Sequence, residues 1–244
     1  MQKPLIAIIL AFTIALSIAI AIPVHAQQPQ QQALIISSLE KYAHTKYLDR
    51  MTGYLTQDGY NVTVVKDTAV TLNFLTTQLN NYDLVFWRTN TYEWYHVTYW
   101  YVGELTNTAA TQAYSQDFAK GYVDDTNAII GVSINFLIEH FLPGSLSHVK
   151  LAILEGSISA NIANVFLAAG VKGTVDYYQY VSLQFGETDG FTAIVLAYLT
   201  SGVSLQNSIW QTITPYITQH FPDPTEVIPI PPVWYMGNAT LTIP

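Results

Sequence analysis

Three consecutive residues, Glu155, Gly156 and Ser157, follow a strand-like apolar run and precede a helix rich in small residues. A buried strand that stops at a glycine turn and feeds a helix is where α/β proteins place reactive side chains. Ser157 carries a hydroxyl group, but a hydroxyl without a neighbouring base is a weak nucleophile. His96 is a candidate base, with Asp176 or Glu155 as orienting groups. The alternative interpretation of Ser157 is a helix N-cap.

Other chemistry is restricted by composition. Cysteine is absent from the 244 residues, which excludes disulfides, thiolate metal sites and a cysteine nucleophile. The histidines show no ligand spacing, and no His/Asp/Glu cluster indicates zinc or calcium. Residues 186–190 lack the spacing and the lysine of a phosphate-binding loop. We therefore expect no metal and no other cofactor.

The charge balance limits the partners. Lys and Arg number 9 and Asp and Glu number 17, which gives a net charge of −8 with no basic cluster. This pattern argues against a nucleic-acid partner. Two triplets, beginning at Asn61 and Asn238, match the N-glycosylation sequon, although such triplets are frequent by chance.

Residues 1–26 are typical of a secretory signal peptide. Lys3 gives a short basic start, residues 5–22 are almost all apolar, and Val24-His25-Ala26 fits a cleavage site. A run of about 18 residues can also span a bilayer, so an uncleaved anchor is the alternative and would be the chain's membrane contact. Residues 27–32 form a polar spacer. We expect a secreted or cell-envelope protein outside the cytoplasmic membrane, with an extracellular protein or peptide as its partner.

Strand and helix patterns alternate from Ala33 onward. Strands are predicted at residues 33–36, 61–65, 82–87, 128–132, 149–154 and 172–175, with a terminal extended segment at 234–243. Helices are predicted from Ser37 or Ser38 to about Gln57 and at 71–79, 111–120, 134–141, 160–169, 188–200 and 204–216. The aromatic stretch 89–105 predicts a hairpin with one packed face. The alternation predicts one three-layer α/β domain over residues 33–244, with a mostly parallel sheet of about six strands.

Three separated stretches resemble the caspase-like (caspase/gingipain/clostripain) cysteine peptidase fold. Residues 82–90, Tyr-Asp-Leu-Val-Phe-Trp-Arg-Thr-Asn, resemble the family's strand that ends in the catalytic histidine, whose position falls on Asn90. Residues 151–176 resemble the nucleophile-bearing strand, and the cysteine position falls on Ser157, or on Gly156 if the register slips by one. Residues 235–244 resemble the family's closing strand.

The resemblance implies a caspase-like fold and a catalytically inactive member, because Asn90 cannot accept a proton and no thiol exists. It implies a secreted pseudo-peptidase with a binding or cell-envelope role, whose cleft is lined by Glu155, Gly156, Ser157, Asn90 and Asp176. The alternative is an extracellular hydrolase that uses Ser157 with His96 as a relocated base. In either case the strands that end near Asn90 and Ser157 should be neighbours.

Overall fold

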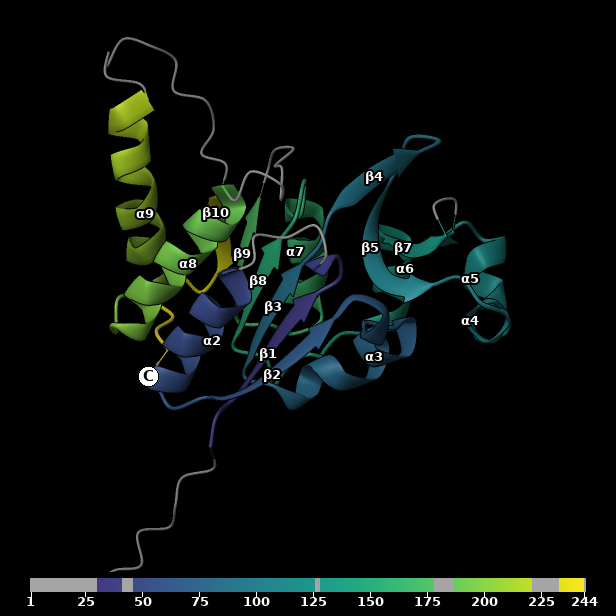
Figure 1. Ribbon diagram of the computed structural model, residues 1–244, viewed down its shortest axis with the longest axis horizontal. Helices are drawn as coiled ribbons and strands as arrows, with labels where there is room; N and C mark the ends of the chain where they lie inside the picture. The colour runs from purple at the N-terminus through teal and green to yellow at the C-terminus, as the bar shows by residue number, and fades with distance from the viewer. Residues whose placement is uncertain (1–29, 41–45, 126–127, 178–186, 221–232, 244) are drawn as a thin grey trace, which may run out of the picture. The chain divides into compact units, whose positions relative to one another are not determined.

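The computed structural model describes residues 30–40, 46–125, 128–177, 187–220 and 233–243 (Figure 1). Residues Gln31–Pro244 form one compact unit. The predicted signal peptide and the first half of the polar spacer, residues 27–29, lie outside the described residues. No helix within the described part of the chain is long and apolar enough to cross a membrane.

A six-stranded sheet is the centre of this unit. Its strands are β1 (Gln32–Ser37), β2 (Asn61–Lys66), β3 (Leu84–Arg88), β8 (Leu151–Glu155), β9 (Gly173–Tyr177) and β10 (Val233–Gly237). They lie in the order β10-β9-β8-β3-β1-β2, and every pairing is parallel except that of β10 with β9. The predicted fold class, a mostly parallel sheet between helical layers, is confirmed.

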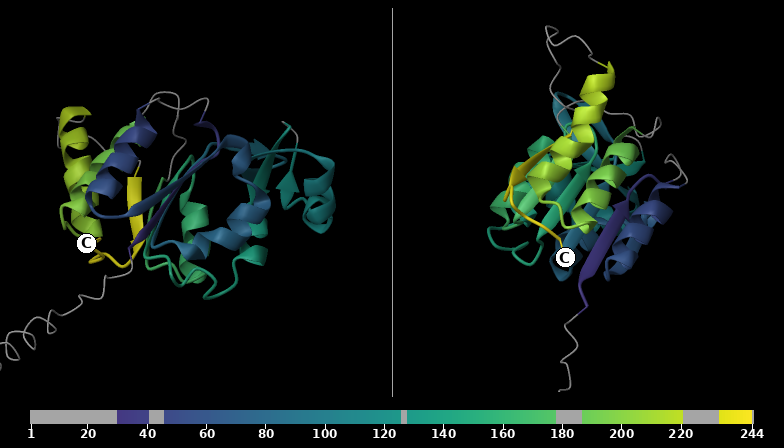
Figure 2. Two further views of the ribbon diagram at one scale, coloured as in Figure 1. Left: turned by 60° about the horizontal axis from the view of Figure 1, so that its bottom comes forward. Right: turned by 90° about the vertical axis from the view of Figure 1, so that its left-hand side faces the viewer.

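Helices cover both faces of this sheet (Figures 1 and 2). They are α2 (Tyr47–Gln57), α3 (Leu72–Gln78), α6 (Ile134–His140), α7 (Ala160–Ala168), α8 (Glu187–Thr200) and α9 (Leu205–His220). We call the side covered by α2, α8 and α9 the first face and the side covered by α3, α6 and α7 the second face. Each face has its own buried apolar cluster.

The alternation of side chains explains why β1 is apolar along nearly its whole length. Ala33 and Ile35 pack into the cluster of the first face, whereas Leu34 and Ile36 pack into that of the second. A strand buried on both sides shows a continuous apolar run instead of an alternating one. Ser37 continues the alternation onto the first face, where the strand ends.

The structure contains a second, antiparallel sheet, and one strand that was expected in the main sheet belongs to it. It contains β4 (Thr91–Trp94), β5 (Val97–Leu105), β7 (Ile129–Ser133) and β6 (Val123–Asp124), in that order. The strand predicted at 128–132 is β7, so it belongs to this sheet, and β10 is the sixth strand of the main sheet. The error arises because an apolar run identifies a buried strand without identifying its neighbour.

The hairpin predicted within residues 89–105 is confirmed as β4 and β5. Trp94 pairs with Val97 across a two-residue turn formed by Tyr95 and His96, which both have positive φ angles, of 46° and 63°. Two consecutive positive φ angles match the twist of the flanking strands. The helix predicted at 111–120 is divided at Tyr114 into α4 (Thr108–Ala113) and α5 (Ser115–Ala119).

Candidate functional site

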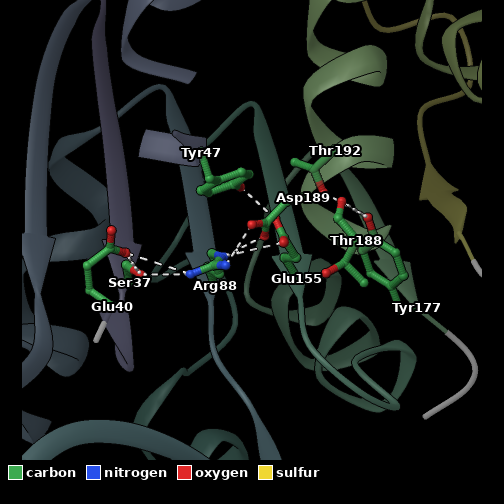
Figure 3. A network of polar contacts seen from close by, with 9 residues as sticks. All are labelled: Ser37, Glu40, Tyr47, Arg88, Glu155, Tyr177, Thr188, Asp189 and Thr192. Atoms are coloured by element: carbon green, nitrogen blue, oxygen red, sulfur yellow. Dashed lines mark hydrogen bonds and ion pairs between the residues drawn. The ribbon is translucent and has the colours of Figure 1, made fainter. Parts of the chain in front are cut away.

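Three neighbouring strands end in polar residues at the same level of the sheet. Ser37 is paired with Arg88, and Arg88 is paired with Glu155, so the last residues of β1, β3 and β8 stand side by side. All three side chains lie on the first face, since each follows a first-face residue by two positions. Together with Glu40, Tyr47 and Asp189, which contact them, we call this set the polar row (Figure 3).

Arg88 is the centre of the polar row. Its side chain is 1% exposed, and its Nε and Nη2 donate to the two carboxylate oxygens of Asp189 at 2.7 and 2.8 Å. Asp189 lies in the first turn of α8, so this bidentate pair joins that helix to β3. The guanidinium carbon also lies 4.8 Å from the centre of the Tyr47 ring, in cation–π range.

The third guanidinium nitrogen of Arg88 is held much less closely. Its Nη1 lies 3.4 Å from the Ser37 hydroxyl and 3.7 Å from Glu40 Oε2. The Ser37 hydroxyl itself donates to Glu40 at 2.6 Å. The Glu40 side chain is 18% exposed, so the polar row reaches solvent at this end. We call the place where Ser37, Glu40 and Arg88 Nη1 meet the open end of the row.

Glu155 lies at the enclosed end of the row. Tyr47 donates its hydroxyl hydrogen to Glu155 Oε2 at 2.5 Å, whereas Oε1 is 3.5 Å from Arg88 Nε and has no hydrogen-bond partner among the described residues. Burial and the neighbouring Asp189 raise the pKa of Glu155 to about 8, against the opposing effect of Arg88. Glu155 is therefore protonated near neutral pH. The charges of Arg88 and Asp189 then cancel, which leaves Glu40 as the unbalanced negative charge.

Asp176 does not belong to the row. It precedes Tyr177 and follows Val175, which both pack on the first face, so its own side chain lies on the second face. Thr174 donates to one of its oxygens at 3.3 Å, and the other has no partner among the described residues. Burial raises the pKa of Asp176 to about 6.

The structure separates the predicted nucleophile from its predicted base. Ser157 is buried, whereas the His96 side chain is 98% exposed at the tip of the hairpin and lies 3.5 Å from Glu93. Ser157 is also not the N-cap: α7 is preceded by Ser159, whose hydroxyl donates to Leu154 O and accepts from Tyr177 N. Ser159 therefore joins the ends of β8 and β9, a role that sequence reasoning missed.

Asn90 and Gly156 are brought close together, as expected from neighbouring strands. β3 pairs with β8, and a Cβ atom on Gly156 would lie 2.9 Å from Thr89 O. Glycine is therefore needed where the two chain segments pass each other. The Asn90 side chain is used locally, because its Oδ1 accepts a hydrogen bond from Thr91 N at 2.9 Å.

The two predicted glycosylation acceptors, Asn61 and Asn238, are exposed. Asn61 Nδ2 donates to Gln32 at 2.8 Å, and Asn238 Oδ1 accepts from the backbone of Thr240 at 3.1 Å. The glycosylation of these two residues stays a prediction. The location of the protein outside the cytoplasmic membrane and its extracellular partner also stay predictions. Within the described residues, no group of three or more His, Asp and Glu side chains is placed to hold a metal ion.

Comparison with known proteins corrects the family assignment. No protein-family model and no curated protein matches the chain. Similar solved structures include a pyridoxal kinase from Staphylococcus aureus, at 10% identity and a TM-score of 0.30 over 75% of this chain and 85% of that one. Another is a putative phosphomethylpyrimidine kinase from Bacteroides thetaiotaomicron, in a crystal form with pyridoxal, at 11% identity and a TM-score of 0.32 over 82% and 90%.

These structures are not caspase-like peptidases, so the predicted membership of that family is wrong, together with the inactive-peptidase function and its Ser157 hydrolase alternative. The resemblance depended on short apolar strands followed by common polar residues, a pattern that parallel sheets share across unrelated folds. TM-scores this low give the chain no kinase fold or activity in place of the rejected one.

Proposed function

We propose that the domain binds a small molecule with an anionic oxygen at the open end of the polar row. The position of the row supports this. From β1 the chain goes to β2 on one side, then returns to β3 on the other side of β1. Helix α2 follows β1 on the first face, whereas α3 precedes β3 on the second face. In open parallel sheets, ligands bind outside the carboxyl ends of the strands at such a switch point.

The observation that carries the proposal is the incomplete coordination of Arg88. Two of its nitrogens have close carboxylate partners, but Nη1 has contacts at 3.4 and 3.7 Å only. A good hydrogen bond from a charged N–H to an anionic oxygen measures about 2.7–2.9 Å. A buried guanidinium N–H with such long contacts is a donor with unused capacity, and it faces the solvent-exposed end of the row.

Glu40 occupies the place that we assign to the ligand. Its carboxylate already accepts from Ser37 and approaches Arg88 Nη1, so it shows which chemical group this end of the row accommodates. A ligand oxygen that replaces Glu40 would receive both hydrogen bonds at unchanged local charge. Glu155 assists by remaining protonated, because a second carboxylate beside Arg88 would compete for the same cation.

Titration with two probes, inorganic phosphate and acetate, tests the proposal. Amide chemical shifts would be followed by NMR at constant ionic strength. We expect saturable shifts at residues around Ser37 and Arg88. Glu40→Gln should tighten binding by up to about fivefold, because it removes a competing carboxylate whose contact is worth up to about 1 kcal/mol. Ser37→Ala should weaken binding by about fivefold, the loss of one hydrogen bond.

Glu139→Gln is the matched control. Glu139 is an exposed carboxylate that pairs with Lys120 at 2.7 Å, so its change alters the net charge as Glu40→Gln does but leaves the row intact. Equal effects of the two substitutions would show that only the overall charge matters, and would refute the proposal. So would the absence of saturable shifts around Ser37 in the wild-type protein.

A further inference from the structure

We propose that two copies of this chain associate through the edge strand β2, which pairs antiparallel with β2 of the second copy around a two-fold axis at Val64. The inference is independent of the ligand proposed above. It starts from the position of β2 at one end of the six-stranded sheet, where its neighbour among the described strands is β1 alone. Along its other edge, no strand of the described residues pairs with its backbone groups.

The sequence of this edge favours pairing. Strand β2 reads Asn-Val-Thr-Val-Val-Lys, with four consecutive β-branched residues and one charge at its end. All six residues pair with β1, so the strand has no bulge along its length. Edge strands that stay single are usually protected by charged side chains, especially Lys, or by proline, bulges, inward charges or short length. Strand β2 has only one of these devices, Lys66 at its end, and it is as long as an average strand.

The backbone direction of β2 identifies which groups face outward. Asn61 N donates to Gln31 O, on the β1 side. In a parallel strand the N–H and C=O of one residue point to the same side, and consecutive residues alternate. Asn61, Thr63 and Val65 therefore face β1, whereas Val62, Val64 and Lys66 present their N–H and C=O groups outward.

These outward groups are complementary to themselves in one register. When Val64 stands opposite Val64 of the second copy, Val62 stands opposite Lys66 of the second copy. By symmetry, Lys66 stands opposite Val62 of the second copy. All three are then hydrogen-bonded pairs, which exchange about six hydrogen bonds in total. Because the same strand is used by both copies, the contact is closed after two copies and yields dimers instead of filaments.

A groove beside β2 provides room for the second copy. It has a volume of about 670 Å³ and lies between the strand and helix α2, with Asp49 and Gly53 of the helix and Val64 and Lys66 of the strand in its lining. Val62 and Val64, whose backbone groups point away from β1, direct their side chains to the first face of the sheet, on the same side as the groove. A Cβ atom on Gly53 would meet no other atom within 4 Å, so the helix is open on this side.

The charges along the groove also suit a second copy. Its lining contains one acid, Asp49, and one base, Lys66. Each copy has a net charge of −8, so most pairs of surfaces would bring like charges together. A two-fold contact along this groove contributes equal numbers of acids and bases, and it places Lys66 beside the uncharged Val62 of the second copy.

The absence of cysteine permits a direct test of the register. Val64→Cys introduces a single thiol, and two such thiols would face each other with Cα atoms about 5.5 Å apart, within disulfide range. Lys66→Cys is the matched control, because the two thiols would be offset by four residues, about 13 Å. We expect covalent dimers from the first variant under mild oxidation and few from the second.

A mixture of the Val62→Cys and Lys66→Cys proteins should also form covalent dimers, because these positions face each other in the proposed register. If Val64→Cys forms no more covalent dimer than Lys66→Cys, the proposed pairing is wrong. If Lys66→Cys alone forms dimers readily, the strands pair in another register and the axis at Val64 is refuted.

Light scattering after gel filtration gives a second readout without a new thiol. We expect the wild-type chain to be dimeric at about 50 µM and Val64→Pro to be monomeric, with an unchanged circular dichroism spectrum. Proline removes an outward N–H and leaves the ladder to β1 intact, as edge strands tolerate. A monomeric wild-type chain would overturn the proposal. This holds even if the monomer binds an added extended peptide along β2, because the edge would then serve another partner.

Discussion

Arg88 shows how a buried charge can be both costly and necessary. Transferring a guanidinium from water costs several kcal/mol, which the close pair with Asp189 and the contact with Tyr47 offset. Removing the cation leaves Asp189 buried without its counterion. The same carboxylate would be harmless on the surface, so the effect of substitution depends on burial rather than on the number of contacts.

Arg88→Ala should therefore lower the free energy of unfolding by about 3–5 kcal/mol. Lys120→Ala, which breaks the exposed pair between Lys120 and Glu139, should change it far less, because solvent screens that pair. Urea denaturation of both variants measures the difference. Replacing Arg88 by Met and Asp189 by Leu together should cost less than Arg88→Ala, and similar losses for all three proteins would contradict this account.

The sequence identified only part of the polar row. Glu155 is a candidate from sequence because it follows a buried strand and precedes a glycine turn. Arg88 lies in the run that resembles the caspase-like family, but an arginine that ends an apolar strand is itself a candidate buried charge. Asp189 and Tyr47 lie 101 and 108 residues from their partners, so no local pattern connects them.

At the scale of elements, Gly103 determines how β5 passes the main sheet. Its φ angle is +111°, and a Cβ atom would lie 2.2 Å from Asp67 O and 2.9 Å from Ser38 O. The pairing of β5 with β7 is irregular between Tyr101 and Leu105, which includes this residue. The backbone of β5 therefore approaches other backbone segments at a distance that only glycine allows.

Gly103→Ala should destabilise the protein by at least about 2 kcal/mol, because the clash is with backbone atoms and the φ angle is strained for alanine. Gly53→Ala is the contrasting change. It lies inside α2 with open space around it and should stabilise the folded chain by about 0.5–1 kcal/mol. Thermal unfolding monitors both variants, and a neutral Gly103→Ala would contradict the proposed close approach.

Some element ends could be predicted because their signals are local, but the helix start predicted at Ser37 or Ser38 is wrong: Ser37 ends β1, and α2 begins at Tyr47. Helix α2 ends at Gln57 and β2 begins at Asn61, as the Asp58-Gly59 stop and the Val/Thr run indicate. The sheet to which a strand belongs is a non-local property. β7 is followed directly by α6, as a strand of the main sheet would be, but its partners β5 and β6 are both antiparallel.

At the scale of the whole molecule, two buried carboxyl groups should make the stability depend on pH. The pKa of Glu155 is raised from 4.5 to about 8, and that of Asp176 from 3.8 to about 6. A raised pKa means that the folded state binds the proton more tightly than the unfolded state does. The stabilising effect is full below the unfolded pKa and is lost as pH rises through the folded value.

We therefore expect the free energy of unfolding to fall between pH 5 and about pH 8. Glu155→Gln should flatten the fall between pH 6 and 8, whereas Asp176→Asn should flatten only the part below about pH 6. Urea titrations at pH 5, 6.5 and 8 would measure this. A wild-type stability that rises over this range would show that the two carboxyl groups are ionised in the folded protein.

The alignment of Ser37, Arg88 and Glu155 also has a consequence for how the sheet assembles. The strands that carry them are nearly uniform in apolar character, so their hydrophobic pattern distinguishes poorly between neighbouring registers. A slip of β3 by one residue would turn Arg88 onto the second face, and a slip by two would displace it by about 7 Å along the sheet. Either arrangement would bury a guanidinium away from Asp189. The contacts within the polar row therefore select one register for β1, β3 and β8, which their apolar residues alone would not specify.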